Sequence, residues 1–176
     1  IDDRKVRILV SNHQSFADIL VVNSLFKHFR WTSKVENFRV PLVGWTLLLN
    51  RAIRIYRGAA DAWHKFEAQA IKSLSEGNSL LIFAEGTRSK SGNLGKFKEG
   101  AFRLALQTHT DIQPMVLDGT SKAVPKSGWV LTGRQEMVLK VLDPLPYDSF
   151  KEMTPAQLAE RVHDIIDKAL NEIRSK

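Results

Sequence analysis

The sequence predicts a single α/β domain with a mixed, mostly parallel sheet flanked by helices. Strand-like apolar runs alternate with helix-like runs along the chain, which is typical of sheets whose strands are joined by helical crossovers. In the predicted strand over residues 79–84, every residue after Ser79 is apolar, as strands buried on both faces tend to be. The 176 residues are 43% hydrophobic and 26% charged, and this size and composition suit one domain with a full core.

The first half of the chain carries four predicted strands and two predicted helices. A helix is predicted to begin at residue 19, directly after the corner at residues 11–18 that follows the first strand, and to continue to about residue 29. A second helix is predicted from about residue 59 to 76, because its apolar residues recur at helical spacing and Gly77 can terminate it. The predicted strands cover residues 6–10, 31–35, 52–57 and 79–84.

In the second half, a helix is predicted to begin near residue 99. Thr154 and Pro155 predict the start of a final helix, with threonine at the N-cap and proline at the first helical position. Strands are predicted over residues 112–117, 129–131 and 137–142. No repeat, linker or low-complexity tract divides these elements, so we expect one domain over residues 1–176.

Residues 41–50 form the most apolar stretch, with Trp45 beside leucines and with Arg39 and Arg51 on either side. Such a segment suits either a surface at the headgroup boundary of a membrane or ordinary core packing, and both interpretations stay open. No apolar run reaches the ~18 residues that a membrane-spanning helix needs. The chain opens on Ile1 rather than methionine, so a processed piece with an upstream anchor also stays open.

The charge and cysteine content narrow the classes of partner and chemistry. A formal net charge of +7 favours anionic partners such as phosphate esters, anionic lipid headgroups or nucleic acid. The absence of cysteine excludes disulfides, thiolate metal sites and a cysteine nucleophile. None of the five histidines has metal-ligand spacing, so we expect no metal.

The first candidate site is His13, at a predicted strand-to-helix corner, with Asp18 five residues further on. Five helical positions turn a side chain by roughly 140°, so the two residues can meet only if His13 precedes the regular helix. A carboxylate bound to one imidazole nitrogen leaves the other nitrogen able to accept a proton. The alternative is a surface histidine and a first-turn aspartate that never meet.

The second candidate site follows the predicted buried strand at residues 79–84, where Glu85, Gly86, Thr87 and Arg88 come in succession. Open α/β sheets place ligands at the carboxyl edge. There Gly86 can turn the backbone with its amides exposed to an anion, and Arg88 offers a planar fork for phosphate. Nearby positive charge comes from Lys90, Lys96 and Lys98. The alternative is a solvated basic loop; neither a nucleotide P-loop nor a G-x-S-x-G elbow is present.

Four blocks in a fixed order resemble the lysophosphatidate acyltransferase family of glycerophospholipid synthesis. They are N-H-Q-S-F-A-D, I-R-I-Y-R, F-A-E-G-T-R-S and Q-P-M-V, and they span about residues 6–117. The spacers that hold Lys34 and residues 41–45 also fit, as does the G-x-x-x-x-F-K-x-G-A run over residues 92–101. Ala84 stands where the family commonly has proline, and Arg54 stands where an apolar residue is usual.

The resemblance implies a glycerolipid acyltransferase-like fold and a role for each block. It implies that His13 is the catalytic base and that Asp18 orients it. It implies that the glycerol-phosphate acceptor is held by Arg57, Glu85, Gly86, Thr87, Arg88 and Lys34. The I-R-I-Y-R block contains both Arg54 and Arg57. The resemblance therefore leaves open which of these two arginines contacts the phosphate. The fourth block, with Pro114, is either an acyl-side element or plain strand packing.

The implied reaction moves a fatty acyl group from an acyl thioester, either acyl-CoA or acyl-ACP, to the free hydroxyl of 1-acyl-glycerol-3-phosphate. An alcohol needs a base to attack, whereas a thiolate leaves readily, so direct transfer needs neither a cofactor nor an acyl-enzyme. The implied partners are the lysophospholipid, the thioester and a membrane surface, together with an acyl carrier protein if the donor is acyl-ACP rather than acyl-CoA. The implied location is the cytoplasmic face of a membrane, with peripheral contact or an anchor upstream of this sequence.

Alternatives remain within and beyond this class. The acceptor could be glycerol-3-phosphate or another lyso-lipid. A non-enzymatic module that binds anionic lipid would need only the basic charge and the Trp45 region. Nucleic-acid binding is suggested by charge alone, and no aromatic-basic stacking pattern supports it, so no nucleic-acid partner is expected.

Overall fold

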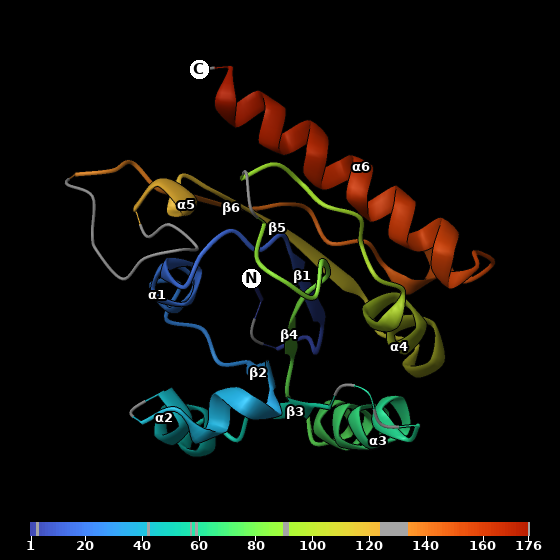
Figure 1. The fold of residues 1–176 in the computed structure, drawn as a ribbon. Helices are drawn as coiled ribbons and strands as arrows, with labels where there is room; N and C mark the ends of the chain where they lie inside the picture. The colour runs from blue at the N-terminus through green and yellow to red at the C-terminus, as the bar shows by residue number, and fades with distance from the viewer. Residues whose placement is uncertain are drawn as a thin grey trace.

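The sheet that organises the chain has six strands, which are β1 (Ile8–Ser11), β2 (Arg30–Lys34), β3 (Ile53–Ile55), β4 (Leu80–Phe83), β5 (Ile112–Asp118) and β6 (Val138–Val141). They lie in the order β3-β2-β4-β1-β5-β6 (Figure 1). The computed structural model describes residues 1–2, 4–41, 43–56, 58, 60–89, 92–123 and 134–175. The predictions made for Arg57, Lys90 and the strand at 129–131 fall outside this part of the chain.

Strands β1 to β5 all run in the same direction. β1 lies between β4 and β5, β2 lies between β3 and β4, and each of these pairs is parallel. Only β6 is antiparallel to its neighbour, with Val141 opposite Met115 of β5. The carboxyl ends of β1 to β5 therefore meet at one edge, and the predicted mixed, mostly parallel sheet is confirmed.

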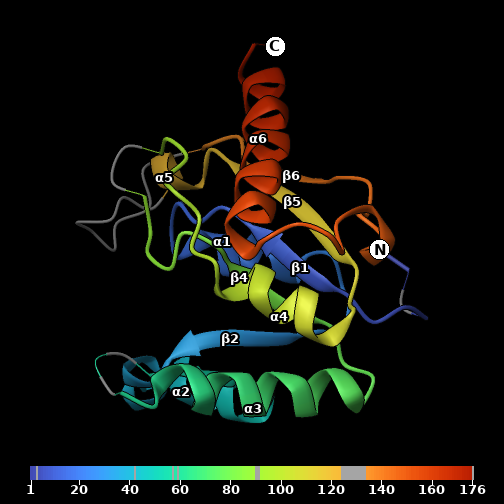
Figure 2. The same ribbon diagram turned by 90° about the vertical axis from the view of Figure 1, so that its right-hand side faces the viewer.

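Helices cover both faces of this sheet. The α-helices are α1 (Ala17–Asn23), α2 (Val43–Leu49), α3 (Ala62–Ser75), α4 (Gly100–Thr108), α5 (Thr120–Ala123) and α6 (Pro155–Arg174). Two short 3-10 helices, η1 (Val35–Arg39) and η2 (Tyr147–Ser149), lie in connections. In Figure 1, α1 and α2 lie on the left of the sheet and α3, α4 and α6 on its right; Figure 2 shows α4 and α6 in front of it.

The side chains of β4 alternate between the two faces, as a strand requires. Leu80 and Ile82 pack into the core formed with α3, α4 and α6, whereas Leu81 packs with α1 on the other face. Phe83, the last residue of β4, packs on the α1 side. Strand β4 therefore separates two apolar regions that both reach the carboxyl edge.

The helix after β1 is shorter than the sequence predicts. It ends at Asn23, where the Ser24 amide donates to the carbonyl groups of Leu20 and Val21, and Phe26 then adopts a left-handed backbone with φ 49°. Phe29 instead packs against Trp31 of β2, with ring centroids 5.4 Å apart. The prediction of a helix to residue 29 was wrong because tertiary packing of an aromatic side chain outweighs local helical periodicity.

The final helix begins as the sequence predicts. The Thr154 hydroxyl accepts from the Gln157 amide at 3.3 Å, and the Gln157 side chain accepts in return from the Thr154 amide at 2.9 Å. This capping box satisfies two amides at the helix start. At its other end, α6 brings Arg174 to Asp118, the last residue of β5, with 2.7 Å between guanidinium and carboxylate. The last helix is therefore tied to the carboxyl edge of the sheet.

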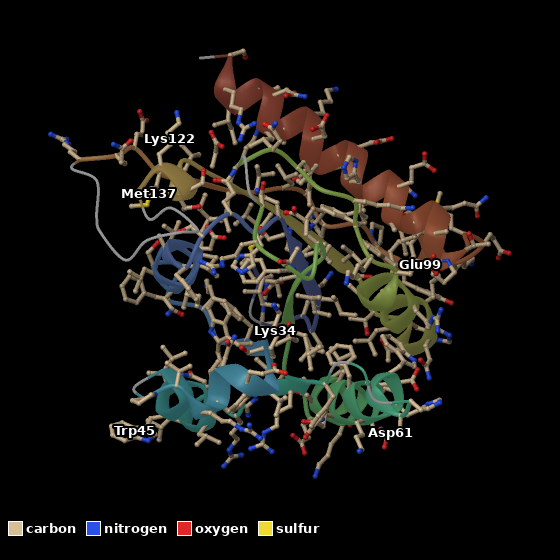
Figure 3. All side chains as sticks on the ribbon, viewed as in Figure 1. Lys34, Trp45, Asp61, Glu99, Lys122 and Met137 are labelled. Atoms are coloured by element: carbon tan, nitrogen blue, oxygen red, sulfur yellow. The ribbon has the colours of Figure 1, made fainter. Side chains whose placement is uncertain are left out.

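The apolar stretch at 41–50 forms α2, and it is only partly packed. Gly44 is buried, but Trp45 is 64% exposed and Leu49 84% exposed. Figure 3 shows Trp45 on the outer side of α2, pointing away from the rest of the chain. Among the described residues, no helix is both long enough and apolar enough to cross a membrane.

Candidate functional site

Polar residues that follow different strands meet at the carboxyl edge of the sheet. His13 follows β1, Lys34 ends β2, Glu85 and Gly86 follow β4, and Thr120 follows β5. The His13 amide donates to Glu85 at 2.8 Å, and His13, Lys34 and Gly86 line one cavity. The two candidate sites of the sequence therefore form one site.

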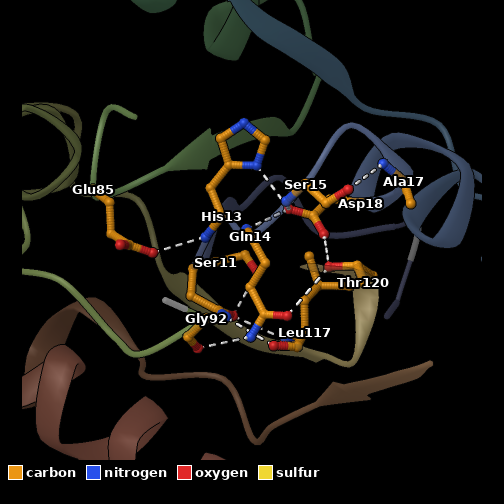
Figure 4. A network of polar contacts seen from close by, with 11 residues as sticks. Ser11, His13, Gln14, Ser15, Ala17, Asp18, Glu85, Gly92, Leu117 and Thr120 are labelled. Carbon is orange, nitrogen blue, oxygen red and sulfur yellow. Dashed lines mark hydrogen bonds and ion pairs between the residues drawn. The ribbon is translucent and has the colours of Figure 1, made fainter. Parts of the chain in front are cut away.

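His13 and Asp18 are in direct contact. The distance from His13 Nδ1 to Asp18 Oδ2 is 2.7 Å (Figure 4). The contact is possible because α1 begins only at Ala17, so His13 lies in the corner before the regular helix. An ionised carboxylate can only accept, so Nδ1 carries the hydrogen and Nε2 is the nitrogen left to take a proton.

Asp18 is fully buried, and its two oxygens accept four hydrogen bonds in all. Oδ2 accepts from the amides of Gln14 at 2.7 Å and Ser15 at 3.0 Å, besides His13, and Oδ1 accepts from the hydroxyl of Thr120. A buried carboxylate is costly unless it is hydrogen-bonded, and this one is satisfied on both oxygens. The carboxylate is thus held in a fixed orientation toward the imidazole.

Thr120 reaches Asp18 because of the turn at Gly119. Gly119 has φ 80°, and a Cβ atom there would lie 2.1 Å from the Glu136 carbonyl oxygen, so only glycine fits. The neighbouring Asn12 side chain donates to the Leu117 carbonyl at 2.8 Å and accepts from the Leu117 amide at 2.9 Å. These contacts fix the end of β5 against the His13 corner.

Gln14 links the His13 corner to Asp118 and to the loop at Gly92. Its side-chain amide donates to Asp118 at 3.1 Å and to the Gly92 carbonyl at 3.2 Å. Burial opposes ionisation of Asp118, but hydrogen bonds from Arg174 and Gln14 outweigh it and lower the pKa of this carboxyl. The ionised Asp118 therefore connects the His13 corner, the loop at Gly92 and α6.

The imidazole ring of His13 stacks on Phe83. Their ring centroids are 4.0 Å apart and their planes differ by 11°. With Asp18 bound to one edge and Phe83 against one face, the ring has little freedom to rotate. The site therefore presents Nε2 in a defined direction.

Glu85 contacts the protein backbone on both of its carboxylate oxygens. Oε1 accepts from the His13 amide at 2.8 Å and Oε2 from the Gly95 amide at 3.1 Å. A Cβ atom at residue 95 would lie 2.7 Å from Oε2, so the close approach requires glycine. The side chain is 6% exposed, and this burial raises the pKa of Glu85 although both amides lower it.

The loop after Glu85 lies beside His13, because the Ser89 amide donates to the His13 carbonyl at 2.8 Å. The turn at Gly86 forms, but the Gly86 amide closes it by donating to the Phe83 carbonyl. That amide is therefore used within the turn itself, and the expected anion site at Gly86 stays a prediction. Thr87 is exposed, and the Arg88 guanidinium lies 4.0 Å from the centroid of the Phe16 ring.

A cavity of about 160 Å³, here called the His13 cavity, opens beside the imidazole. Its walls include Trp31, Leu47 and Phe83, and Lys34 lies at its polar side. Arg54 is exposed and stacks on Phe38, 5.0 Å from the ring centroid, outside this cavity. Arg57, the other arginine of that block, lies outside the described residues.

Sequence reasoning missed several residues of this site. Thr120, Gln14 and Phe83 all hold His13 or Asp18. Gln14 and Phe83 lie inside the first and third blocks, but their residue types assigned them no role there, and Thr120 belongs to no motif. Over the described ranges, no group of three or more histidine or acidic residues is placed to hold a metal ion. A partly exposed histidine bound to a buried aspartate, beside cationic side chains, is suited to acid–base chemistry on an anionic substrate.

Comparisons with known proteins show that the chain is similar to acyltransferases. The family described as Acyltransferase matches residues 2–118. A chloroplastic 1-acyl-sn-glycerol-3-phosphate acyltransferase of Arabidopsis thaliana is 39% identical over 118 residues, which are 67% of this chain and 33% of that protein. A 1-acyl-sn-glycerol-3-phosphate acyltransferase of Saccharomyces cerevisiae is 31% identical over 182 positions, covering 97% of this chain and 57% of that protein.

The fold has a close structural relative. The crystal structure of the 1-acyl-sn-glycerophosphate (LPA) acyltransferase PlsC from Thermotoga maritima superimposes with a TM-score of 0.84 at 25% identity. The match covers 98% of this chain and 68% of that one. The chain belongs to the Acyltransferase family, and it spans between a third and three fifths of the length of the curated relatives.

Proposed function

We propose that the protein transfers a fatty acyl group from an acyl thioester to the free hydroxyl of 1-acyl-glycerol-3-phosphate, giving phosphatidic acid. The observation that carries the proposal is the contact of 2.7 Å between His13 Nδ1 and Asp18 Oδ2. Family membership supports it, since several curated relatives are named 1-acyl-sn-glycerol-3-phosphate acyltransferases.

In the proposed reaction, Nε2 of His13 takes the proton of the acceptor hydroxyl as that oxygen attacks the thioester carbonyl. Asp18 steadies the imidazolium that forms, and the hydrogen bonds on both of its oxygens keep it in place. The new C–O bond replaces the C–S bond, and the thiolate leaves with the proton from His13 as a thiol. No covalent acyl-enzyme is required.

The acceptor phosphate is neutralised by cationic side chains around His13. Lys34 lines the His13 cavity, and Arg88 belongs to the loop whose Ser89 amide donates to the His13 carbonyl. The family resemblance adds Arg57 to these phosphate-binding side chains. Glu85 acts differently: with both oxygens on backbone amides, it positions His13 and the Gly95 loop rather than contacting phosphate.

The His13 cavity takes the acyl chain of the thioester, because the reacting carbonyl must lie at His13 and the cavity walls are apolar. The same cavity is lined by Leu47 of α2, whose outer face exposes Trp45 and Leu49. We assign that outer face to a membrane surface, with peripheral contact on the cytoplasmic side, where anionic lipids attract basic proteins. Either acyl-CoA or acyl-ACP fits as donor.

An acyl-transfer assay tests the proposal. The protein is mixed with acyl-CoA or acyl-ACP and a panel of acceptors, namely lysophosphatidate, glycerol-3-phosphate and neutral lyso-lipids, and thiol release is followed. We expect transfer to lysophosphatidate and a loss of at least ~10²-fold in turnover for His13→Ala with the fold intact. Full activity of His13→Ala would refute the mechanism, and lipid binding without transfer would favour a non-enzymatic module.

A further inference from the structure

A second cavity, here called the Trp63 cavity, lies on the other side of β4 from the His13 cavity. It measures about 360 Å³ and is lined by Trp63 and Phe66 of α3, Ile82 of β4 and Ala101 of α4. Phe66, Ile82 and Ala101 belong to the buried core on the α3 and α4 side of the sheet. In Figure 1 these two helices lie on the right of β4, opposite α1 and α2.

The two cavities meet at the carboxyl end of β4. Lys34, Ile55, Phe83 and Gly86 line both of them, whereas His13 lines only the His13 cavity. Successive residues of a strand point to opposite faces, so Ile82 faces the Trp63 cavity while Phe83 stands between the cavities. Two apolar chains could therefore lie on either side of Phe83 with their polar ends close to His13.

Positive charge lies at the mouth of the Trp63 cavity. Lys34 and Lys98 are both lining residues, and Figure 3 shows Lys34 near the middle of the carboxyl edge. The Lys98 side chain runs along Gly86, since a Cβ atom there would lie 3.1 Å from Lys98 Cδ and 3.3 Å from its Nζ. The Lys98 amide donates to the Ala84 carbonyl at 2.8 Å, which fixes this residue beside the end of β4.

An apolar cavity with two ammonium groups at its mouth matches a ligand with one hydrocarbon chain and one anionic headgroup. The thioester is a poor match, because its carbonyl must reach His13 and His13 does not line this cavity. The acceptor is a good match, because its phosphate and its existing acyl chain are joined through the glycerol that carries the reacting hydroxyl.

We propose that the Trp63 cavity holds the acyl chain that the acceptor already carries, with Lys98 and Lys34 at its phosphate. This inference rests on the proposed function and adds to it. It assigns each acyl chain its own side of β4. It also makes the protein select a lyso-acceptor over glycerol-3-phosphate, which has no chain to bury.

Ala62, at the start of α3, allows a direct test because it lines the Trp63 cavity and is partly exposed. Ala62→Phe should narrow the cavity. We expect it to raise KM for long-chain lysophosphatidate by about tenfold, the equivalent of losing the burial of about two methylene groups. The KM and chain-length preference for acyl-CoA should stay unchanged. The matched variant Thr46→Phe, on the His13 cavity, should change the acyl-CoA chain-length preference and leave the acceptor KM unchanged.

Acceptor kinetics are measured below the micelle concentration, and thermal unfolding checks that each variant folds. A shift in acyl-CoA chain-length preference in Ala62→Phe, or an unchanged acceptor KM, would overturn the inference while the proposed function stood. Absence of transfer by the unmodified protein to any lyso-acceptor would instead refute the proposed function.

Lys98→Gln gives a second measurement that does not depend on filling the cavity. Titration calorimetry should show weaker binding of lysophosphatidate in Lys98→Gln, by about fivefold or more, but unchanged binding in Lys96→Gln. Lys96 is the matched control because it is exposed two residues away and does not line the Trp63 cavity. Equal affinity in both variants would remove Lys98 from the phosphate site and overturn that part of the inference.

Discussion

Thr120 donates its hydroxyl hydrogen bond to Asp18, a residue 102 positions earlier in the chain. Both residues are fully buried, and the contact satisfies the one carboxylate oxygen that His13 does not use. Thr120 touches neither the imidazole nor either cavity. In the proposed mechanism, its role is to hold the carboxylate of Asp18, which in turn orients His13 as the base.

We expect Thr120→Val to lower kcat by about tenfold or more, because a hydrogen bond to a charged group contributes ~1.5–3 kcal/mol. KM values for donor and acceptor should stay the same. Thr120→Ser keeps the hydroxyl and should recover most of kcat, and thermal unfolding monitors the fold of both. If the serine variant is as slow as the valine variant, packing rather than the hydrogen bond explains the loss.

Substitutions of Arg88 test whether the cationic side chains near His13 bind the acceptor phosphate. We expect Arg88→Ala to raise the acceptor KM by about tenfold while the donor KM changes little, since only the acceptor carries phosphate next to the reacting glycerol. Arg88→Lys should recover part of the binding but not the stacking on Phe16, which depends on the planar guanidinium. Equal losses for both substrates would indicate damaged folding instead. The resemblance implies the same outcome for Arg57→Ala.

The pair His13 and Asp18 could be predicted from sequence because its geometry is local: five residues and one strand-to-helix corner decide it. Thr120 could not, because its partner lies 102 residues away and a lone threonine has no pattern. The orientation of the Glu85 side chain could not be predicted from the sequence either. A carboxylate after a buried strand can face substrate or backbone, and only the closeness of the Gly95 amide decides between them.

The strand pattern was predictable for the same reason as the His13 corner, since period and length are local properties. The end of α1 was not, because it depends on Phe29 packing against Trp31 after the chain has turned. The exposure of α2 was predictable only in part. Its apolar composition was evident, but only the arrangement of the fold shows that Trp45 and Leu49 face outward.

Glu85 makes stability depend on pH in a defined direction. Burial raises its pKa in the folded protein, so the folded state holds a proton that the unfolded state has already lost. The contribution of Glu85 to the free energy of unfolding therefore falls as pH rises from the unfolded value, ~4.3, through the raised folded value. Unfolding at a series of pH values should show that Glu85→Gln lacks this fall.

The same variant should be slower in catalysis. A glutamine has one acceptor oxygen in place of two, so either the His13 amide or the Gly95 amide loses its partner. We expect a lower kcat without a change in the acceptor KM. A raised acceptor KM at unchanged kcat would instead assign Glu85 to substrate binding.

Asp118 makes stability depend on pH in the opposite direction. Its pKa is lowered in the folded protein because the hydrogen bonds from Arg174 and Gln14 outweigh burial, so its contribution is present above the unfolded value, ~3.9, and is lost as pH falls through the folded value. We expect Arg174→Met to lower Tm at neutral pH. On acidification, the Tm of this variant should fall by less than the Tm of the unmodified protein. Parallel Tm curves for the two proteins would show that this ion pair adds nothing to stability.

The outer face of α2 allows the membrane assignment to be tested apart from catalysis. Replacing Trp45 and Leu49 by serine removes two exposed apolar side chains, and a bound apolar side chain contributes ~1.5–3 kcal/mol at a lipid boundary. We therefore expect cosedimentation of Trp45→Ser/Leu49→Ser with vesicles containing anionic lipid to weaken at least tenfold.

The matched control is Met137→Ser. Met137 is an exposed apolar residue as well, and Figure 3 shows it beside α5, far from Trp45. Its replacement should leave vesicle binding unchanged, because only the α2 face is assigned to lipid. Added salt should weaken the binding of both the unmodified protein and the control, since the net charge of +7 contributes by attraction to anionic headgroups. If both variants bind vesicles as the unmodified protein does, α2 is not the membrane surface.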